Sequence, residues 1–241
     1  MIALEPLRGL PEIRPGDDLA ALLSACGTEL LRTDVLVIAH KVVSKAEGRV
    51  VRLADVAPGT RATELAAEHG KDPRAVEVIL GEATELVRAD AGRLICRTRH
   101  GFVCANAGVD RSNAGGEDRA VLLPLDPDAS ARALRGRLGC AVVIADSFGR
   151  AWRKGQSEVA IGCAGLAPLR DHRGEPDLDG REMRASVIAI ADEAAAAADL
   201  ARSKTSREPA VRIRGLDAHV TPDDGPGAAA LVRAWADDLF R

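Results

Sequence analysis

The sequence predicts an α+β fold in which mixed sheets pack against helices. Short apolar strands and amphipathic helices follow one another without the strict strand–helix–strand alternation of a doubly wound sheet. The 241 residues, 46% of them apolar and 29% charged, suffice for one large domain or two small ones and have the composition of a soluble globular protein. No internal repeat or low-complexity linker divides the chain. We therefore expect a single domain over residues 1–241, with two interleaved lobes as the alternative arrangement.

The first half of the chain is expected to mix helices with short strands. Gly16–Ser24 is typical of a short helix capped by Asp17 or Asp18, and Asp34–Ala39 (DVLVIA) of a short apolar strand. Two amphipathic helices and three strands follow, and a proline stands in the first turn of the second helix. They are the helices Thr60–His69 and Pro73–Arg88 and the strands Leu94–Arg97, Gly101–Ala105 and Val121–Leu123.

The second half is expected to end in helices. Asp126–Ser130 (DPDAS) caps a helix that reaches Leu138. The longest helix follows a loop rich in Asp, Arg and Gly, and its alanine content suits close packing. The remaining elements are the strands Cys140–Ala145, Val159–Ala164 and Pro209–Arg214, the loop Pro168–Gly180, the long helix at about Glu182–Arg202, and a terminal helix Gly227–Phe240.

The composition argues against several classes of protein. The net charge of −3, the absence of tyrosine and an aromatic content of 2% disfavour a nucleic-acid partner. The start of the chain has no secretory pattern, and the longest apolar tract, Ala185–Ala201, carries three acidic residues, so no membrane span is expected. The cysteines are odd in number and form no C-x-x-C pair, which indicates structural thiols in a reducing cytoplasm. They are Cys26, Cys96, Cys104, Cys140 and Cys163.

Common nucleotide and hydrolase motifs are missing, but three segments share another design. The sequence has no G-x-x-x-x-G-K-[ST], no G-x-G-x-x-G after a strand, no H-E-x-x-H, no G-x-S-x-G and no histidine pair at zinc-ligand spacing. Instead, three apolar strands end in oxygen-bearing or cationic side chains, which suit phosphate and Mg²⁺ or Mn²⁺. The segments are VIAHKVVSKAEG with His40, Lys41, Ser44 and Lys45, CANAGVDRSN with Asn106, Asp110 and Asn113, and VIADSFGR with Asp146 and Ser147.

Each of these segments also has a plainer explanation, which the sequence leaves open. An aspartate after a strand is often a turn former or a helix cap, and Asn106-Ala-Gly could be a simple turn. Lys41 could lie on a solvated face. The cationic turn RAWRKGQ is either a solvated loop or a site that captures an anionic substrate. Its polar side chains are Arg150, Arg153, Lys154 and Gln156.

Several motifs in one order resemble a known family. GLPEI, HKVVSKAEGRV, GFVCANAGVDRSN, LLPLDPDASA, ADSFGRAWRKGQ, AIGCAG and the ADE before the alanine tract lie between about Leu10 and Gly215. Together they resemble the coenzyme F420-0:L-glutamate ligases, the gamma-glutamyl ligases of the deazaflavin coenzyme. The resemblance implies a distinctive α+β fold and an intertwined homodimer. It also implies GTP as co-substrate, two divalent ions (Mg²⁺ or Mn²⁺) and K⁺, and the addition of L-glutamate to the carboxylate of coenzyme F420-0 through an acyl phosphate. Some relatives carry a fused flavin reductase domain, which we do not expect in a chain that stops at Arg241.

The resemblance also implies the roles of individual residues. The nucleotide-binding positions are Leu10, Pro11, Glu12, Ile13, His40, Lys41, Lys45, Asn113, Ser203 and Lys204. The metal-binding positions are Asp110, Asp146 and Ser147, and the catalytic ones are Lys45, Asp110 and Asp146. Archaeal relatives place a glutamate for the second ion where this chain reads ARSKTSREP, so that ion is held differently here or Lys204 replaces part of its charge. Our own hypothesis assigns Arg150, Arg153 or Lys154 to the phosphodiester of the precursor.

Two other functions stay open from the sequence. A metal-dependent phosphohydrolase could use the same aspartates to release phosphate from GTP or a small phosphoester. A non-catalytic nucleotide-binding module would bind GTP without turnover.

Overall fold

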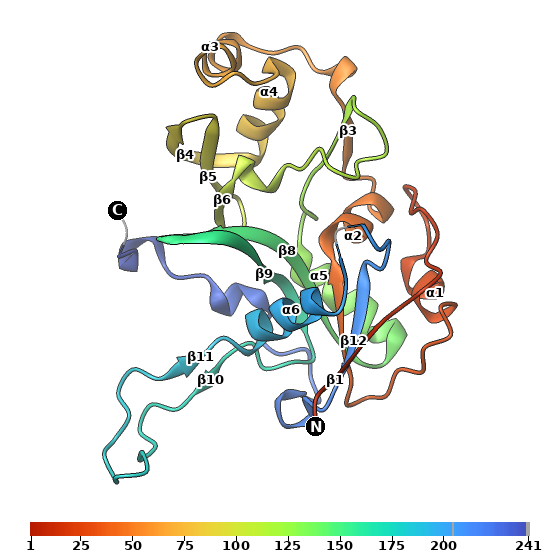
Figure 1. Ribbon diagram of the computed structural model, residues 1–241, viewed down its shortest axis with the longest axis vertical. Coiled ribbons are helices and arrows are strands. Elements are labelled where there is room, and N and C mark those ends of the chain that lie inside the picture. Colours follow the sequence, from red (N-terminus) through yellow and green to blue (C-terminus); the bar gives the residue numbers. More distant parts are fainter. Residues whose placement is uncertain (204, 240–241) are drawn as a thin grey trace.

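The computed structural model describes residues 1–203 and 205–239 and confirms the α+β class (Figure 1). The strands are β1 (Ala3–Pro6), β2 (Val35–Ala39), β3 (Val50–Arg52), β4 (Ala83–Asp90), β5 (Arg93–Thr98), β6 (Val103–Ala105), β7 (Arg119–Val121), β8 (Ala141–Arg150), β9 (Arg153–Ala164), β10 (Arg170–Asp171), β11 (Val187–Ile188) and β12 (Ala210–Arg214). The α-helices are α1 (Leu19–Ser24), α2 (His40–Ala46), α3 (Thr60–His69), α4 (Pro73–Glu82), α5 (Pro127–Leu138) and α6 (Ile190–Leu200). Within this described part, no helix is long and apolar enough to cross a membrane.

A five-stranded sheet with the order β1-β12-β2-β8-β9 forms the centre of the lower part of the molecule (Figure 1). β2 and β8 run parallel, and the other neighbours are antiparallel. β2 is apolar throughout because both of its faces are covered. Leu36 and Ile38 lie in the cluster that includes residues of α1, α2 and α5, whereas Val35 and Val37 lie in the cluster that includes α6. The alternation expected of a strand therefore divides β2 between two hydrophobic layers.

A smaller group of elements, which we call the upper lobe, stands above this sheet in Figure 1. It comprises β3–β7, α3 and α4, and the chain builds it in one excursion between α2 and α5. β4, β5 and β6 form an antiparallel sheet, and β3 pairs with β7. The buried face of α4 (Val76 and Ile79) packs with Leu65 of α3 and Leu94 of β5 in a separate apolar cluster. The lobe thus has its own core.

The helix predicted at Pro73–Arg88 is wrong in its second half. α4 ends at Glu82, and Ala83 already has extended backbone angles (φ −91°, ψ 137°). Residues Ala83–Asp90 instead form β4, which pairs with β5 through a tight turn at Ala91 and Gly92, both with positive φ. The strand β5 supplies backbone hydrogen-bond partners to Ala83–Asp90, and this pairing overrides the helix propensity of the segment.

Two further helices are shorter than predicted. The long helix starts at Ile190 rather than Glu182, because Val187–Ile188 pair as β11 with β10 in an arm that projects from the molecule (Figure 1). The structure describes residues 227–239 of the predicted terminal helix Gly227–Phe240, and these residues form no α-helix. The chain there makes 3-10 turns at Ala228–Leu231 and Trp235–Asp237, because tertiary contacts, including Arg97 stacked 4.6 Å from the Trp235 ring centre, determine its course.

The strand expected to end at Ala145 continues to Arg150. β9 pairs with it from Ala164 back to Arg153, so the two strands form a long hairpin. Asp146 and Ser147 therefore lie inside a strand, not in a turn after one. The paired backbone of β9 keeps the polar half of β8 extended where the sequence suggested a loop.

Candidate functional site

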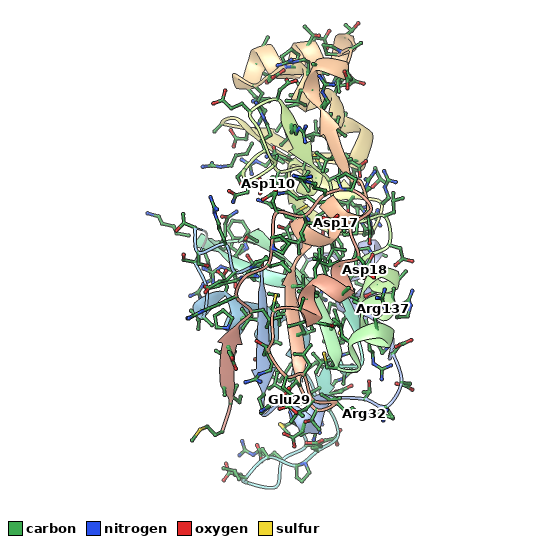
Figure 2. The ribbon with its side chains drawn as sticks, turned by 90° about the vertical axis from the view of Figure 1, so that its right-hand side faces the viewer. Asp17, Asp18, Glu29, Arg32, Asp110 and Arg137 are labelled. Atoms are coloured by element: carbon green, nitrogen blue, oxygen red, sulfur yellow. The ribbon has the colours of Figure 1, made fainter. Side chains whose placement is uncertain are left out.

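A cavity of about 470 Å³ lies where the upper lobe meets the β8–β9 hairpin. Its walls include Asp110 from the loop after η2 (Asn106–Gly108) and Asp146 and Ser147 from β8. Figure 2 shows Asp110 at the junction between the upper lobe and the sheet. The structure thus brings Asp110 together with the adjacent pair Asp146 and Ser147, which follow it by 36 and 37 residues in the sequence.

The parallel pairing of β2 and β8 places two of the predicted residues side by side. Ala39 aligns with Ala145, so the next residues, His40 at the start of α2 and Asp146, are neighbours. His40 is buried, and its Nε2 atom lies 3.3 Å from Asp146 Oδ1 without the alignment of a hydrogen bond. Its other ring nitrogen lies 3.3 Å from Ser44 Oγ. Because a buried polar atom without a hydrogen bond destabilises the fold, His40 Nε2 is a candidate partner for a bound ligand.

Asp110 forms the best-connected charge of the cavity. The Lys41 ammonium lies 2.7 Å from Asp110 Oδ2 and also donates to the carbonyl and hydroxyl oxygens of Ser112 at 2.9 and 2.7 Å. The Ser112 N–H donates to Asp110 Oδ1 at 2.6 Å. Burial alone would raise the pKa of Asp110, but Lys41 and the donors of Ser112 outweigh it and hold the pKa below its usual value. Asp110 is therefore ionised at neutral pH, as a metal ligand must be.

A left-handed turn precedes Asp110. Asn106, Ala107 and Gly108 all have positive φ (54°, 52° and 74°), a conformation that costs a residue other than glycine of order 1–3 kcal/mol. A Cβ atom on Gly108 would lie 2.6 Å from the Leu123 side chain, so this position requires glycine for space as well as for backbone angles. The turn that the sequence left open as the plainer explanation of Asn106-Ala-Gly is present, and it ends two residues before Asp110.

The two segments expected to bind nucleotide are joined by an ion pair. Lys45 is mostly buried in α2, and its Nζ atom lies 2.5 Å from Glu12 Oε1 in the LPEI segment. Ile13 is buried in the core, and Leu10 packs against it. The loop Leu10–Ile13 is thus fixed against α2, the helix that also carries His40 and Lys41.

A buried charge network below Ser147 was not predicted. The Ser147 hydroxyl donates to Glu158 Oε1 across the β8–β9 pair, and Glu158 Oε2 lies 3.3 Å from Arg202 Nη2. Arg202 also donates to the Pro209 carbonyl at 2.7 Å. Glu158 and Arg202 are only 4% and 6% exposed. The one signal in the sequence is an acidic residue directly before the apolar run Val159–Ala164.

The register of the β8–β9 hairpin shifts beside this network. Ile144 aligns with Gly162 and Ala145 with Ala160, so β9 carries one extra residue at Ile161. Asp192, from the ADE segment of α6, accepts a hydrogen bond from the Ala160 N–H at 2.9 Å. Burial raises the pKa of Asp192 above its usual value. Since bulges redirect the side chains that follow them, this one helps to aim Asp146 and Ser147.

Several predicted residues lie outside the cavity. Arg150, Arg153 and Lys154 are exposed at the tip of the hairpin, where Arg150 donates to the Lys154 carbonyl at 2.8 Å, and they do not line the cavity walls. Asn113 and Ser203 are exposed, and Lys204 lies outside the described residues. The cavity instead contains two cations that were not predicted, Lys71 and Arg111.

Metal binding can be tested against the donors present. The described side chains include no group of three His, Cys, Asp or Glu arranged around one ion. Mg²⁺ commonly takes one or two carboxylates and completes its shell with water and phosphate oxygens, so the set Asp110, Asp146 and Ser147 fits a Mg²⁺ or Mn²⁺ ion shared with a phosphate ligand. Burial and the charge of Asp146 raise the pKa of the nearby Cys104 thiol to about 12, so this thiol is protonated at neutral pH.

Together these features define a class: an α+β protein whose cavity combines carboxylates, a hydroxyl and the cationic side chains of Lys71 and Arg111, a set that fits a phosphate ester and a divalent ion. The chain belongs to the F420-0:gamma-glutamyl ligase family, whose model matches residues 9–215. It is 45% identical over 248 residues to the coenzyme F420:L-glutamate ligase of Methanopyrus kandleri, covering 100% of this chain and 98% of the relative. It is 43% identical to the proteins of the same name from Methanothermobacter thermautotrophicus (100% and 99% covered) and Halobacterium salinarum strain R1 (97% and 93%).

Proposed function

We propose that this protein joins L-glutamate by an amide bond to the carboxylate of coenzyme F420-0, with GTP and a divalent metal ion as co-substrate and cofactor. The observation that carries the proposal is the convergence of Asp110, Asp146 and Ser147 on one cavity, in a chain similar over its full length to ligases of that name. The K⁺ requirement, a second metal ion, a homodimer and a cytoplasmic location are further parts of the proposal, carried over from the family resemblance and the composition.

The chemistry needs an activated carboxylate. A carboxylate oxygen of the acceptor attacks the γ-phosphorus of GTP, GDP leaves, and an acyl phosphate forms. The glutamate amine, after losing a proton, attacks the acyl carbon, and phosphate leaves as the amide bond forms. A divalent ion, when bound, neutralises the charge that develops on the transferred phosphoryl group.

The chain's own residues have separate parts in this scheme. Asp110 and Asp146 would hold the ion, and Ser147 would give it a hydroxyl oxygen while the hydroxyl proton is donated in a hydrogen bond to Glu158. Lys41 and Lys45, paired with Asp110 and Glu12, lie on α2 and would place positive charge against the phosphates. The LPEI loop, fixed by the pair of Lys45 and Glu12, would hold the rest of the nucleotide.

The test is mass spectrometry of a reaction containing coenzyme F420-0, L-glutamate, GTP, Mn²⁺ and K⁺, with GDP and phosphate measured in parallel. Products that grow in glutamyl steps, with GDP formed only when both substrates are present, are expected. Asp146→Asn should abolish turnover because it removes a negative charge from the metal site, whereas the matched change Asp90→Asn on an exposed strand end should not. GDP release without glutamyl product would indicate a phosphohydrolase, and GTP binding without GDP formation would indicate a binding module.

A further inference from the structure

We propose that Lys71, held by Asn106 and assisted by Arg111, binds a carboxylate group of L-glutamate in the cavity. The inference rests on the proposed function and specifies which wall of the same cavity recognises the amino-acid substrate. All three residues line the cavity that contains Asp110, Asp146 and Ser147.

The backbone of Lys71 is fixed at the joint between two helices. Gly70 ends α3 with a left-handed conformation (φ 63°), and the Lys71 N–H donates to the Ala66 carbonyl at 2.9 Å. Asp72 then caps α4 by accepting from the Arg74 N–H at 3.0 Å. Because both neighbouring helix ends are capped, the Lys71 side chain starts from a defined position at the cavity wall.

The charge of Lys71 is available to a ligand. Its ammonium donates to the neutral amide oxygen of Asn106 at 3.4 Å, and the ion pairs among the described residues do not include it. The two lysines of α2 are instead paired, Lys41 with Asp110 at 2.7 Å and Lys45 with Glu12. An ammonium has three donors, so Lys71 keeps two donors for an anion, and its charge has no ion-pair partner among the described residues.

The left-handed turn explains how Asn106 reaches this lysine. Asn106 leads the strained turn that ends just before Asp110, and asparagine tolerates this backbone conformation better than most residues. One short segment therefore carries both the amide that orients Lys71 and the carboxylate proposed for the metal. This connection fixes the distance between the anion-binding wall and the reacting centre.

Arg111 supplies a second cation in the same wall. Its Nη2 atom donates to the Glu117 carbonyl at 2.9 Å, and it too forms no ion pair among the residues that the structure describes. L-glutamate carries two carboxylates, and neither is consumed when its amine forms an amide. Two cations on one wall match that pair of charges and leave the amine free to face the activated acceptor.

The test compares Lys71→Met and Asn106→Asp with the exposed control Arg88→Met in the full-length protein. Asn106→Asp is informative because it leaves Lys71 in place but puts a carboxylate where the amide oxygen lies, which compensates the ammonium charge. Binding of L-glutamate is measured by calorimetric titration in the presence of GDP and Mn²⁺, and steady-state constants are measured for L-glutamate, GTP and coenzyme F420-0. Circular dichroism and thermal unfolding establish that each variant is folded.

We expect both cavity variants to weaken L-glutamate binding and raise its KM at least tenfold, with the KM for GTP and for coenzyme F420-0 changed less than twofold. A larger change in the GTP constant would assign Lys71 to the nucleotide phosphates, and a larger change in the coenzyme constant would assign it to the acceptor; either result overturns the proposal, as does an unchanged L-glutamate affinity. The titration does not depend on turnover. A wild-type protein that binds L-glutamate through Lys71 but makes no product would therefore disprove the ligase function and not this site.

Discussion

Replacing Glu158 by glutamine tests the charge network below Ser147. The substitution keeps the shape of the side chain and an oxygen that can accept the Ser147 hydroxyl, but it removes the countercharge of buried Arg202. At a separation of 3.3 Å, the attraction between the two charges is roughly 5 kcal/mol at an effective dielectric constant of about 20. Breaking one partner of a buried pair typically costs about 3–5 kcal/mol.

The structure favours the lower end of that range. Asp199 Oδ1 lies 3.6 Å from Arg202 Nε, so part of the countercharge remains after the substitution. We therefore expect Glu158→Gln to lower the free energy of unfolding by about 3 kcal/mol, which corresponds to a fall in Tm of roughly 6–12 °C for a chain of this size.

The assay is urea unfolding followed by circular dichroism, with the midpoint and slope fitted together. Asp199→Asn is the matched control, because this residue is 37% exposed and its loss should cost at most about 1 kcal/mol. If Glu158→Gln lowers the free energy of unfolding by less than about 1 kcal/mol, with the urea dependence of that free energy unchanged, then Arg202 does not depend on Glu158 to balance its charge.

Two further predictions concern stability. Gly108→Ala should destabilise the protein by about 2–4 kcal/mol, because the new methyl group meets Leu123 in a left-handed backbone; Gly136→Ala, in open space on α5, is the matched control and should stabilise slightly in the same urea titration. Asp34 is fully buried and accepts two hydrogen bonds of 2.8 Å from Arg214. Burial alone would raise its pKa, but these bonds hold the pKa below its ordinary value of 3.8. The stabilisation that ionised Asp34 gives the folded protein is therefore complete above the unfolded-state pKa, and it is lost as the pH falls through the lower folded-state pKa. Asp34→Asn should cost about 2–3 kcal/mol at pH 7, and the difference from wild type should shrink in acid unfolding experiments below pH 3.8; a constant difference would contradict this assignment.

The sequence predicted the α+β class and most of the strands because their signals are local. Asp34–Ala39 and Cys140–Ala145 are short apolar runs, and the structure has strands at both places. A local sequence pattern does not show which strands pair with each other. The end of α4 at Glu82 depends on the β4–β5 hairpin, and the late start of α6 depends on β10, which lies 16 residues or more before β11.

The same distinction holds at the site. Asp110, Asp146 and Ser147 stood out because oxygen-bearing residues follow apolar runs, and the structure gathers them in one cavity. That His40 lies beside Asp146 follows from the register of Ala39 with Ala145, which no local pattern encodes. Lys71 had no signal at all, since a lysine between two helices is ordinarily a solvated residue. Its position becomes informative only once Asn106 is found to face it.

The parallel pair β2–β8 also has a consequence for the order of folding. Because the chain between these strands, residues 40–140, includes the whole upper lobe, joining them closes a loop of about 100 residues, at an entropic cost of roughly 4 kcal/mol. Until that closure, His40 and Asp146 belong to separate parts of the chain. We therefore expect the proposed metal site to form late, after the local hairpins and helices, since topologies rich in distant contacts fold slowly.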